Sequence, residues 1–367
     1  MAEKLLYEDQ DREKYEPDPD ESPIGGRKLF TQPYDLTIAS LIGQIKDNTL
    51  HLRPLSDRPL FQRKYVWTDR LASLLIESIL LNVPIPPCYF AQNEEFELDV
   101  IDGQQRIFSI YRFLNNQFVL SGLEVLTEEN GKRFHELDLQ LQRKIKTHTL
   151  RAVVITNDSH PEIQFDVFQR LNTNTVPLNA QELRNCIFRG PLNTLLGKLA
   201  KYEPWLEILG RKAPDQRLRD EELILRFFAF YIKGVDSYRT PQKHWLNDVA
   251  KDGRKFSEEE IEKLQIIWCS TIDKCIIVFA PNECFRRFPP SGKRQVINRA
   301  LMDLLQLTMS RHSIKEVQDI SAGFRQAYAS LFDNEDFQDL ISRAVDHKSR
   351  TRKRFEIWEE RLVREIF

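Results

Sequence analysis

Cysteine and excess charge are both scarce in this sequence. The 367 residues include five cysteines, and 53 Lys and Arg residues against 55 Asp and Glu leave a formal net charge of -2. The cysteines are scattered, with no Cys-x-x-Cys pair and no histidine at ligand spacing, which argues against a zinc site and is typical of reduced thiols. Because the net charge is close to zero, the surface as a whole is not basic. Any surface that binds nucleic acid therefore has to come from local basic patches.

Long apolar runs and the common phosphate-binding loops are also missing. The N-terminus is charged from Glu3 onward and no apolar run could span a bilayer, so we expect a cytoplasmic protein with no membrane contact. Neither Gly-x-x-x-x-Gly-Lys-Ser/Thr nor Gly-x-Gly-x-x-Gly occurs. A nucleophile elbow, a His-rich nuclease signature and paired carboxylates in a magnesium motif are absent too. The sequence therefore predicts no cofactor and no metal site.

The pattern of residues changes along the chain, which is 41% hydrophobic and can bury a large core. Residues 1–33 are acidic and proline-rich and predict a disordered arm. Residues 34–190 mix short strands with helices and predict an α+β domain with a small mixed sheet. Helical periodicity dominates residues 191–367, which predicts a mainly α-helical C-terminal domain.

Several elements can be placed from local signals. Helices are expected to start at Thr37, at the Thr68/Asp69 cap and at Asn179, and another is expected over residues 138–146. Strands are expected over residues 50–52, 88–91, 97–101 and 150–155. The apolar spacing of residues 107, 110, 111 and 114 predicts a helix over 104–114, directly after the strand 97–101.

The string Asp-Gly-Gln-Gln-Arg lies at the junction of that strand and helix. The start of a helix favours an anion, because its N–H groups are unpaired and its dipole is positive there. We predict that Asp102 activates a water or a nucleotide hydroxyl, that Gln104 and Gln105 bind a ligand edge, and that Arg106 holds a phosphate. The plainer interpretation makes Asp102 a helix N-cap and Gly103 a turn residue.

Two further segments supply candidates for substrate or DNA binding. Residues 61–67 mix basic and aromatic side chains, as suits a groove that follows a nucleic-acid backbone. The candidates in this segment are Gln62, Arg63, Tyr65 and Trp67. In residues 168–175 a helix end runs into a loop rich in amides and hydroxyls, with candidates Arg170, Asn172 and Asn174. Core packing of the aromatics and an ordinary helix terminus are the competing interpretations.

Two basic clusters in the helical half could also hold phosphates. One surrounds Pro289-Pro290 and includes Arg286, Arg287 and Arg299, and the other covers residues 347–354. A run of charges is more often a solvated face, so both interpretations stay open.

The three motif segments resemble the ParB/sulfiredoxin-like N-terminal domain family of GmrSD-type modification-dependent restriction enzymes. They are residues 61–67, the string from Val100 to Arg106, and residues 168–185 with Arg-Leu-Asn and Pro-Leu-Asn-Ala-Gln-Glu-Leu-Arg-Asn. The resemblance implies an anti-phage role directed at modified DNA, such as glucosylated DNA, with the Asp-Gly-Gln-Gln-Arg centre tied to nucleotide hydrolysis or DNA processing. Many relatives fuse or pair this domain with an HNH-type nuclease, and no such His/Asn motif is visible here, so a partner nuclease is one expectation.

Three functions are compatible with these motifs and with the resemblance. The favoured one is metal-independent hydrolysis of modified DNA at the N-glycosidic bond of a modified base, leaving abasic sites. The second is hydrolysis of a nucleoside triphosphate by a regulatory subunit that licenses a separate nuclease. The third is a ParB-like adaptor that binds DNA without chemistry.

Overall fold

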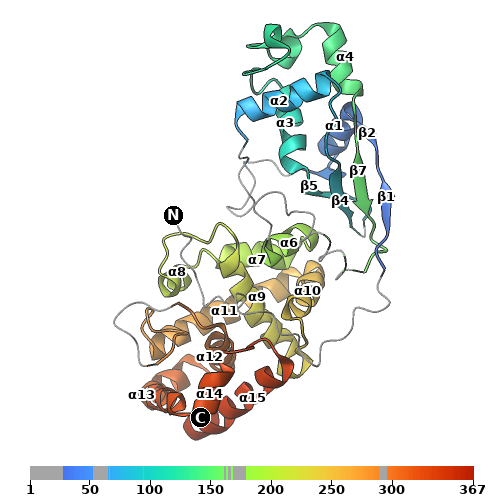
Figure 1. The fold of residues 1–367 in the computed structure, drawn as a ribbon. Coiled ribbons are helices and arrows are strands. Elements are labelled where there is room, and N and C mark those ends of the chain that lie inside the picture. Colours follow the sequence, from blue (N-terminus) through green and yellow to red (C-terminus); the bar gives the residue numbers. More distant parts are fainter. Residues whose placement is uncertain are drawn as a thin grey trace. The chain divides into compact units, whose positions relative to one another are not determined.

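The computed structural model describes residues 28–52, 65, 67–93, 95–160, 163, 167, 179–288 and 296–367. These residues fall into two compact units that meet in the sequence between Ile187 and Phe188. The first unit combines a small mixed sheet with helices, and the second is helical (Figure 1). The predicted α+β fold class with a mainly helical C-terminal part is therefore confirmed.

The main sheet has five short strands in the order β1-β7-β4-β5-β3. Their bounds are β1 Thr31–Pro33, β3 Leu50–His51, β4 Cys88–Gln92, β5 Leu98–Asp102 and β7 Ala152–Ile155. β1 is antiparallel to β7, and β4 is antiparallel to β5 with a register shift between Tyr89 and Phe90. The pairs β4–β7 and β3–β5 are parallel, which makes the sheet mixed. A separate antiparallel pair joins β2 (Leu36–Thr37) to β6 (Thr149–Leu150).

Two expectations need correction in this region. The last residues assigned to the acidic arm, Thr31–Pro33, form strand β1 because their backbone pairs with β7. The expected strand 150–155 is divided at Arg151, since β6 pairs with β2 and β7 with β1 and β4. The rest of the predicted arm, up to residue 27, lies outside the described residues.

Helices cover both faces of the sheet. The first face packs against α1 (Ile38–Lys46), α2 (Asp69–Leu80), α3 (Gln104–Leu114) and α4 (Leu139–Thr147), which lie near the strands in Figure 1. Residues of alternating parity point to this core, for example Phe90 of β4 and Val100 of β5. The second face carries a smaller cluster in which Ala91, Ile101 and Ile155 meet Leu183 of α6 (Ala180–Ile187).

Helix starts follow the capping signals in the sequence. Thr37, Thr68 and Asp138 each accept a main-chain N–H of the first turn of α1, α2 and α4. Asn179 and Glu182 exchange hydrogen bonds of 2.8 Å each at the start of α6, forming a capping box. The predicted starts of these helices are confirmed.

A buried carboxylate fixes the loop that follows α3. Glu77 of α2 is 5% exposed and accepts the main-chain N–H groups of Glu124, Val125 and Leu126 at 2.8–3.2 Å. Burial alone raises the pKa of Glu77, but these three hydrogen bonds outweigh it and hold the pKa below the ordinary 4.5.

We expect Glu77→Gln to lower the free energy of unfolding at pH 7 by about 2 kcal/mol, because hydrogen bonds to a charged group are lost. The carboxylate's contribution is complete above the ordinary pKa of 4.5 and is lost as the pH falls through the lowered folded value. Urea unfolding at pH 7 and at pH 3 measures this, with exposed Glu128→Gln as the control. A deficit that does not shrink in acid would contradict the assignment.

The second unit is built from helices. They are α7 Pro191–Leu199, α8 Glu203–Leu209, α9 Arg219–Lys233, α10 Gln242–Asp252, α11 Glu258–Val278, α12 Arg299–Arg311, α13 Ile314–Ser330, α14 Glu335–Leu340, α15 Lys348–Trp358 and α16 Arg364–Ile366. A π-helical turn, η8 (Glu359–Val363), joins α15 to α16. Four tryptophans lie in the core, namely Trp205, Trp245, Trp268 and Trp358, each at most 1% exposed.

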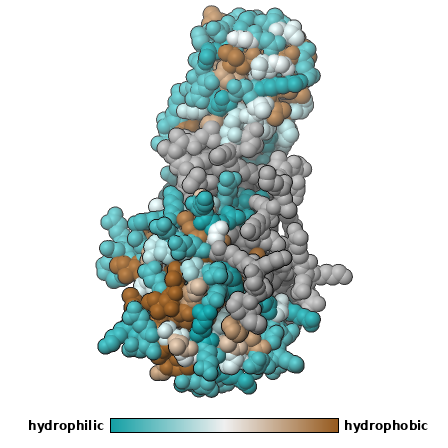
Figure 2. All heavy atoms as spheres, turned by 90° about the vertical axis from the view of Figure 1, so that its left-hand side faces the viewer, coloured by the Kyte–Doolittle hydropathy of each residue, from teal (hydrophilic) through white to brown (hydrophobic). Residues whose placement is uncertain are grey.

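Hydrophilic residues cover most of the coloured surface facing the viewer in Figure 2, and apolar patches appear on the helical unit. Over the described ranges, no helix combines the length and apolar character needed to cross a bilayer.

Candidate functional site

The Asp-Gly-Gln-Gln-Arg string forms the connection between β5 and α3. Asp102 is the last residue of β5, Gly103 has φ 98°, and α3 starts at Gln104. Gly103, and not Asp102, is therefore the N-cap, and a glycine has no side chain with which to cap the helix. The interpretation of Asp102 as the cap was wrong, because a left-handed glycine separates it from the helix. The main-chain N–H groups at the start of an α-helix can donate hydrogen bonds to an anion.

Only glycine fits at position 103. A Cβ atom there would lie 2.4 Å from Cys88 Sγ, and the positive φ is itself costly for other residues. Cys88 is 2% exposed, and burial raises the pKa of its thiol to about 11, with smaller opposing effects from Arg106 and Asp102. The thiol is neutral near pH 7 and is no candidate nucleophile.

Arg106 is bound to the protein itself. Its guanidinium donates to Pro86 O, to Pro87 O at 3.3 Å, and to Asp102 Oδ2 at 2.9 Å. The side chain is 13% exposed, whereas that of Asp102 is 37% exposed. Arg106 thus fixes the segment before β4 and orients the Asp102 carboxylate, and it acts here as a positioning residue.

The structure places four predicted site residues at this junction. Asp102 and Arg106 form an ion pair, and Gln104 is half-buried at the first position of α3. Gln105 is also half-buried, and its carbonyl accepts the Ser109 hydroxyl at 2.7 Å. A partly exposed carboxylate beside an uncapped helix start is an arrangement that can hold a phosphate and direct a water at a neighbouring atom.

Tyr65 lies along the same helix. Its hydroxyl is 2.9 Å from Ser109 Oγ, its ring centroid is 5.2 Å from that of Phe108, and the guanidinium of Arg112 lies 4.8 Å from the ring centroid. Tyr65 and Trp67 are partly buried against the main core. Packing against the core therefore explains why aromatic residues occupy positions 65 and 67. Their role in binding stays a prediction. Five other candidates, Gln62, Arg63, Arg170, Asn172 and Asn174, lie outside the described residues.

A polar group on the second face of the sheet was not predicted as part of the site. Gln181, Glu182, Arg184 and Asn185 of α6 are each at most 7% exposed, as is Asp99 of β5 at 5%. Arg184 Nη1 donates to Gln181 Oε1 at 3.1 Å. The available signal was the polar string Gln-Glu-Leu-Arg-Asn on a helix with an otherwise apolar face. Asp99 also lies on this face, since it alternates with Val100 along β5.

Several described arginines of the two basic clusters in the helical unit make bonds within the protein. Arg286 is 5% exposed and donates to Pro281 O, Cys284 O and Ile208 O. In residues 347–354, Arg350 pairs with Asp339 at 2.6 Å and Arg354 is fully buried. Their interpretation as phosphate contacts is weakened for these members, because a guanidinium bonded to carbonyls has few donors left.

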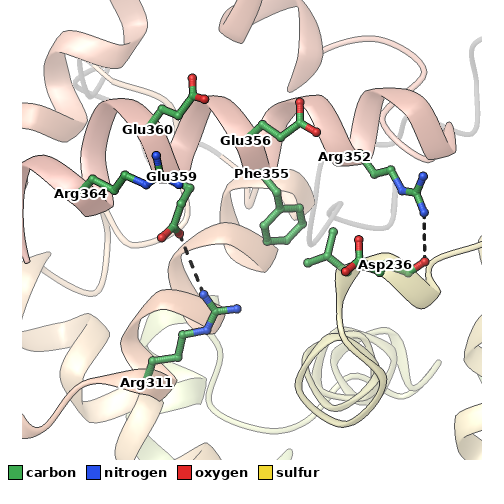
Figure 3. A pocket seen from close by; sticks show the side chains of 9 residues that line it. Asp236, Arg311, Arg352, Phe355, Glu356, Glu359, Glu360 and Arg364 are labelled. Atoms are coloured by element: carbon green, nitrogen blue, oxygen red, sulfur yellow. Dashed lines mark hydrogen bonds and ion pairs between the residues drawn. The ribbon is translucent and has the colours of Figure 1, made fainter.

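A pocket of about 430 Å³ lies beside the π-helical turn of the helical unit (Figure 3). The ring of Phe355 faces into it between an ion pair and a hydrogen bond. The ion pair joins Arg311 to Glu359 at 4.0 Å, and in the hydrogen bond Arg352 donates to the Asp236 carbonyl at 3.2 Å. Its remaining lining residues are Val235, Glu356, Glu360 and Arg364. Charges of both signs meet in this pocket, so it does not select one class of ligand.

Among the described residues, no group of three or more His, Cys, Asp or Glu side chains is placed to hold a metal ion. Residues 38–189 match the family model described as the GmrSD restriction endonuclease N-terminal domain. The match spans β5, α3 and α6, and confirms the resemblance to the N-terminal domain family of GmrSD-type enzymes. No curated protein and no solved structure matches the chain.

Proposed function

We propose, from the premise that residues 38–189 match the GmrSD restriction endonuclease N-terminal domain, that this chain is a component of a modification-dependent restriction system. Its substrate is modified DNA of phage origin, such as glucosylated DNA. The reaction is metal-independent hydrolysis of the N-glycosidic bond of the modified base, which leaves an abasic site.

The observation that carries the proposal is the placement of Asp102. Its carboxylate is held by Arg106 at 2.9 Å next to the uncapped start of α3. Cleavage of an N-glycosidic bond develops positive charge on the sugar, which a fixed carboxylate stabilises while it orients the attacking water. The phosphate of the same nucleotide is anionic and suits the helix start.

Each residue then has a distinct role. The C1′–N bond breaks, water adds its oxygen to C1′, and the departing base takes up a proton. Asp102 acts on the sugar and the water, and the amides of Gln104 and Gln105 bind the edge of the base. Arg106 holds Asp102 in place, and the main-chain N–H groups of α3 take over the phosphate contact first expected from Arg106.

A second candidate is hydrolysis of a nucleoside triphosphate that licenses a partner nuclease. The feature that favours it is the same uncapped helix start, since triphosphates bind at such termini. In that case Asp102 positions the water that attacks the terminal phosphate. A non-catalytic adaptor is the remaining alternative.

One experiment separates these functions. Purified protein is incubated in EDTA with glucosylated and with plain DNA, and half of each sample then receives mild alkali. We expect strand breaks only after alkali and only in glucosylated DNA. Unchanged DNA with phosphate release from GTP or CTP would favour the second candidate, and DNA binding with neither reaction would favour the adaptor.

A further inference from the structure

Helix α4 and the strands that follow it carry a basic surface in the first unit. Residues 139–157 include Arg143, Lys144, Lys146 and Arg151 but no Asp or Glu, although the whole chain has a net charge of -2. Helix α1, which packs against α4, has no acidic residue within its bounds either. A chain that is nearly neutral overall needs such a local surface to bind a polyanion.

The exposed side chains follow one line along this segment. Arg143 and Thr147 are four residues apart on α4 and therefore lie on the same side of the helix. Thr149 and Arg151 continue the line through the strands, because side chains alternate there and Leu150 between them is buried. Arg143, Thr147, Thr149 and Arg151 are all exposed, and together they are called the basic stripe.

The two arginines of the basic stripe are not used inside the protein. Over the described part of the chain, no ion pair or hydrogen bond joins the guanidinium of Arg143 or Arg151 to another residue. Asp35 lies opposite Arg151 when the β2–β6 register is continued beyond the pair Leu36 and Leu150, but these two charged side chains form no ion pair. Both guanidinium groups therefore keep their donors for a ligand.

The basic stripe ends at the edge of the sheet where Asp102 lies. Asp102 pairs with Tyr89 in the antiparallel β4–β5 ladder, and Cys88 pairs with Ala152 in the parallel β4–β7 ladder. The Cys88 N–H donates to the Arg151 carbonyl at 2.9 Å. Only strand β4 separates β5 from β7 (Figure 1). At the ordinary spacing of strands, the Cα atoms of Asp102 and Arg151 are about 10 Å apart.

We propose that the basic stripe binds the phosphate backbone of the DNA strand whose modified nucleotide reaches Asp102. This inference rests on the proposed function and names the residues that hold the flanking phosphates. A guanidinium matches the oxygens of a phosphate, and Arg106 is not available for this role because it is bonded to Pro86 and Pro87. The path from Arg143 to Arg151 is about 6 Å of helix and about 13 Å of strand, so the two arginines contact different phosphates.

The test measures how salt weakens DNA binding by the full chain. Fluorescence anisotropy follows a labelled DNA duplex without modified bases, in EDTA, because a backbone contact does not depend on the base. Each phosphate contact contributes about 0.9 to the slope of log K against log salt concentration. We expect Arg143→Gln and Arg151→Gln each to make the slope shallower by about 0.9, and the double variant by about 1.8. Arg151→Lys keeps the charge and should keep the slope.

Lys46→Gln is the matched control. Lys46 is exposed at the end of α1. It comes shortly before β3, whose Leu50 pairs with Leu98 at the start of β5, so it lies toward the end of the sheet opposite Asp102. This variant should keep the slope of the unaltered protein, because its charge is away from the proposed path of the strand.

The outcomes separate this inference from the proposed reaction. Unchanged slopes in both arginine variants, or an equal change in Lys46→Gln, would overturn the inference, leave the reaction standing and assign the basic stripe to an acidic protein partner. Loss of slope in the arginine variants without alkali-sensitive breaks in glucosylated DNA would support the basic stripe and reject the reaction. An unaltered protein that binds no DNA would contradict both.

Discussion

Asp102→Asn is expected to reduce hydrolysis of modified DNA by at least about 100-fold, because in the proposed reaction the carboxylate acts on the sugar and the water. The amide oxygen of asparagine can still accept the hydrogen bond from Arg106, which is 2.9 Å from Asp102 Oδ2 in the native protein. We therefore expect DNA binding to persist and the Tm to change by no more than about 3 °C. Alkali-sensitive breaks in glucosylated DNA measure the activity.

A matched control is available at an ion pair between α2 and α3. Asp69 pairs with Arg112 of α3 at 3.0 Å and is 54% exposed, so Asp69→Asn disturbs a comparable ion pair away from the β5–α3 junction. This variant should keep its activity. Full activity of Asp102→Asn, or equal losses in both variants, would remove Asp102 from the catalytic role.

Gly103→Ala is expected to cost about 3 kcal/mol of folding stability, the largest stability effect predicted for this chain. The added Cβ would meet Cys88 Sγ at 2.4 Å and Cys88 Cβ at 3.0 Å, at a φ of 98°. A left-handed backbone alone costs a non-glycine residue roughly 1–2 kcal/mol, and the collision with a buried side chain adds to it. Urea unfolding measures the loss.

Two further variants separate strain from collision. Gly131 has φ 85° with nothing within 4 Å of an added Cβ, so Gly131→Ala should cost only about 1 kcal/mol. Combining Gly103→Ala with Cys88→Ala removes the sulfur and should recover part of the loss. If the double variant loses as much stability as the two single variants added together, the contact with Cys88 does not cause the loss seen in Gly103→Ala.

Local elements near the site were predictable because their signals are short-range. Helix α3 occupies the predicted residues 104–114, since the 3.6-residue apolar period identifies the buried side of a helix. Strand β5 ends one residue beyond the expected 97–101. The Thr68 and Asn179 caps depend on neighbouring residues, so sequence alone sufficed for them.

The partners of charged residues could not be predicted. Arg106 lies in a string that suggests phosphate binding, yet it donates to carbonyls of Pro86 and Pro87, about twenty positions earlier in the chain. Arg354 belongs to a basic run that reads as a solvated face, yet it is 0% exposed. Charge patterning reveals where arginines are dense but not which carbonyls or carboxylates the folded chain brings to them.

The bonds of Arg106 and the crowding at Gly103 separate two kinds of constraint within one short motif. Both residues are needed to build the β5–α3 connection, whereas Asp102 is the partly exposed member available for chemistry. A domain with this fold but without the proposed reaction would still need the glycine and the arginine to form the connection. Substitutions that unfold the domain and substitutions that only remove the proposed activity are therefore expected at different positions. Position 102 belongs to the second kind.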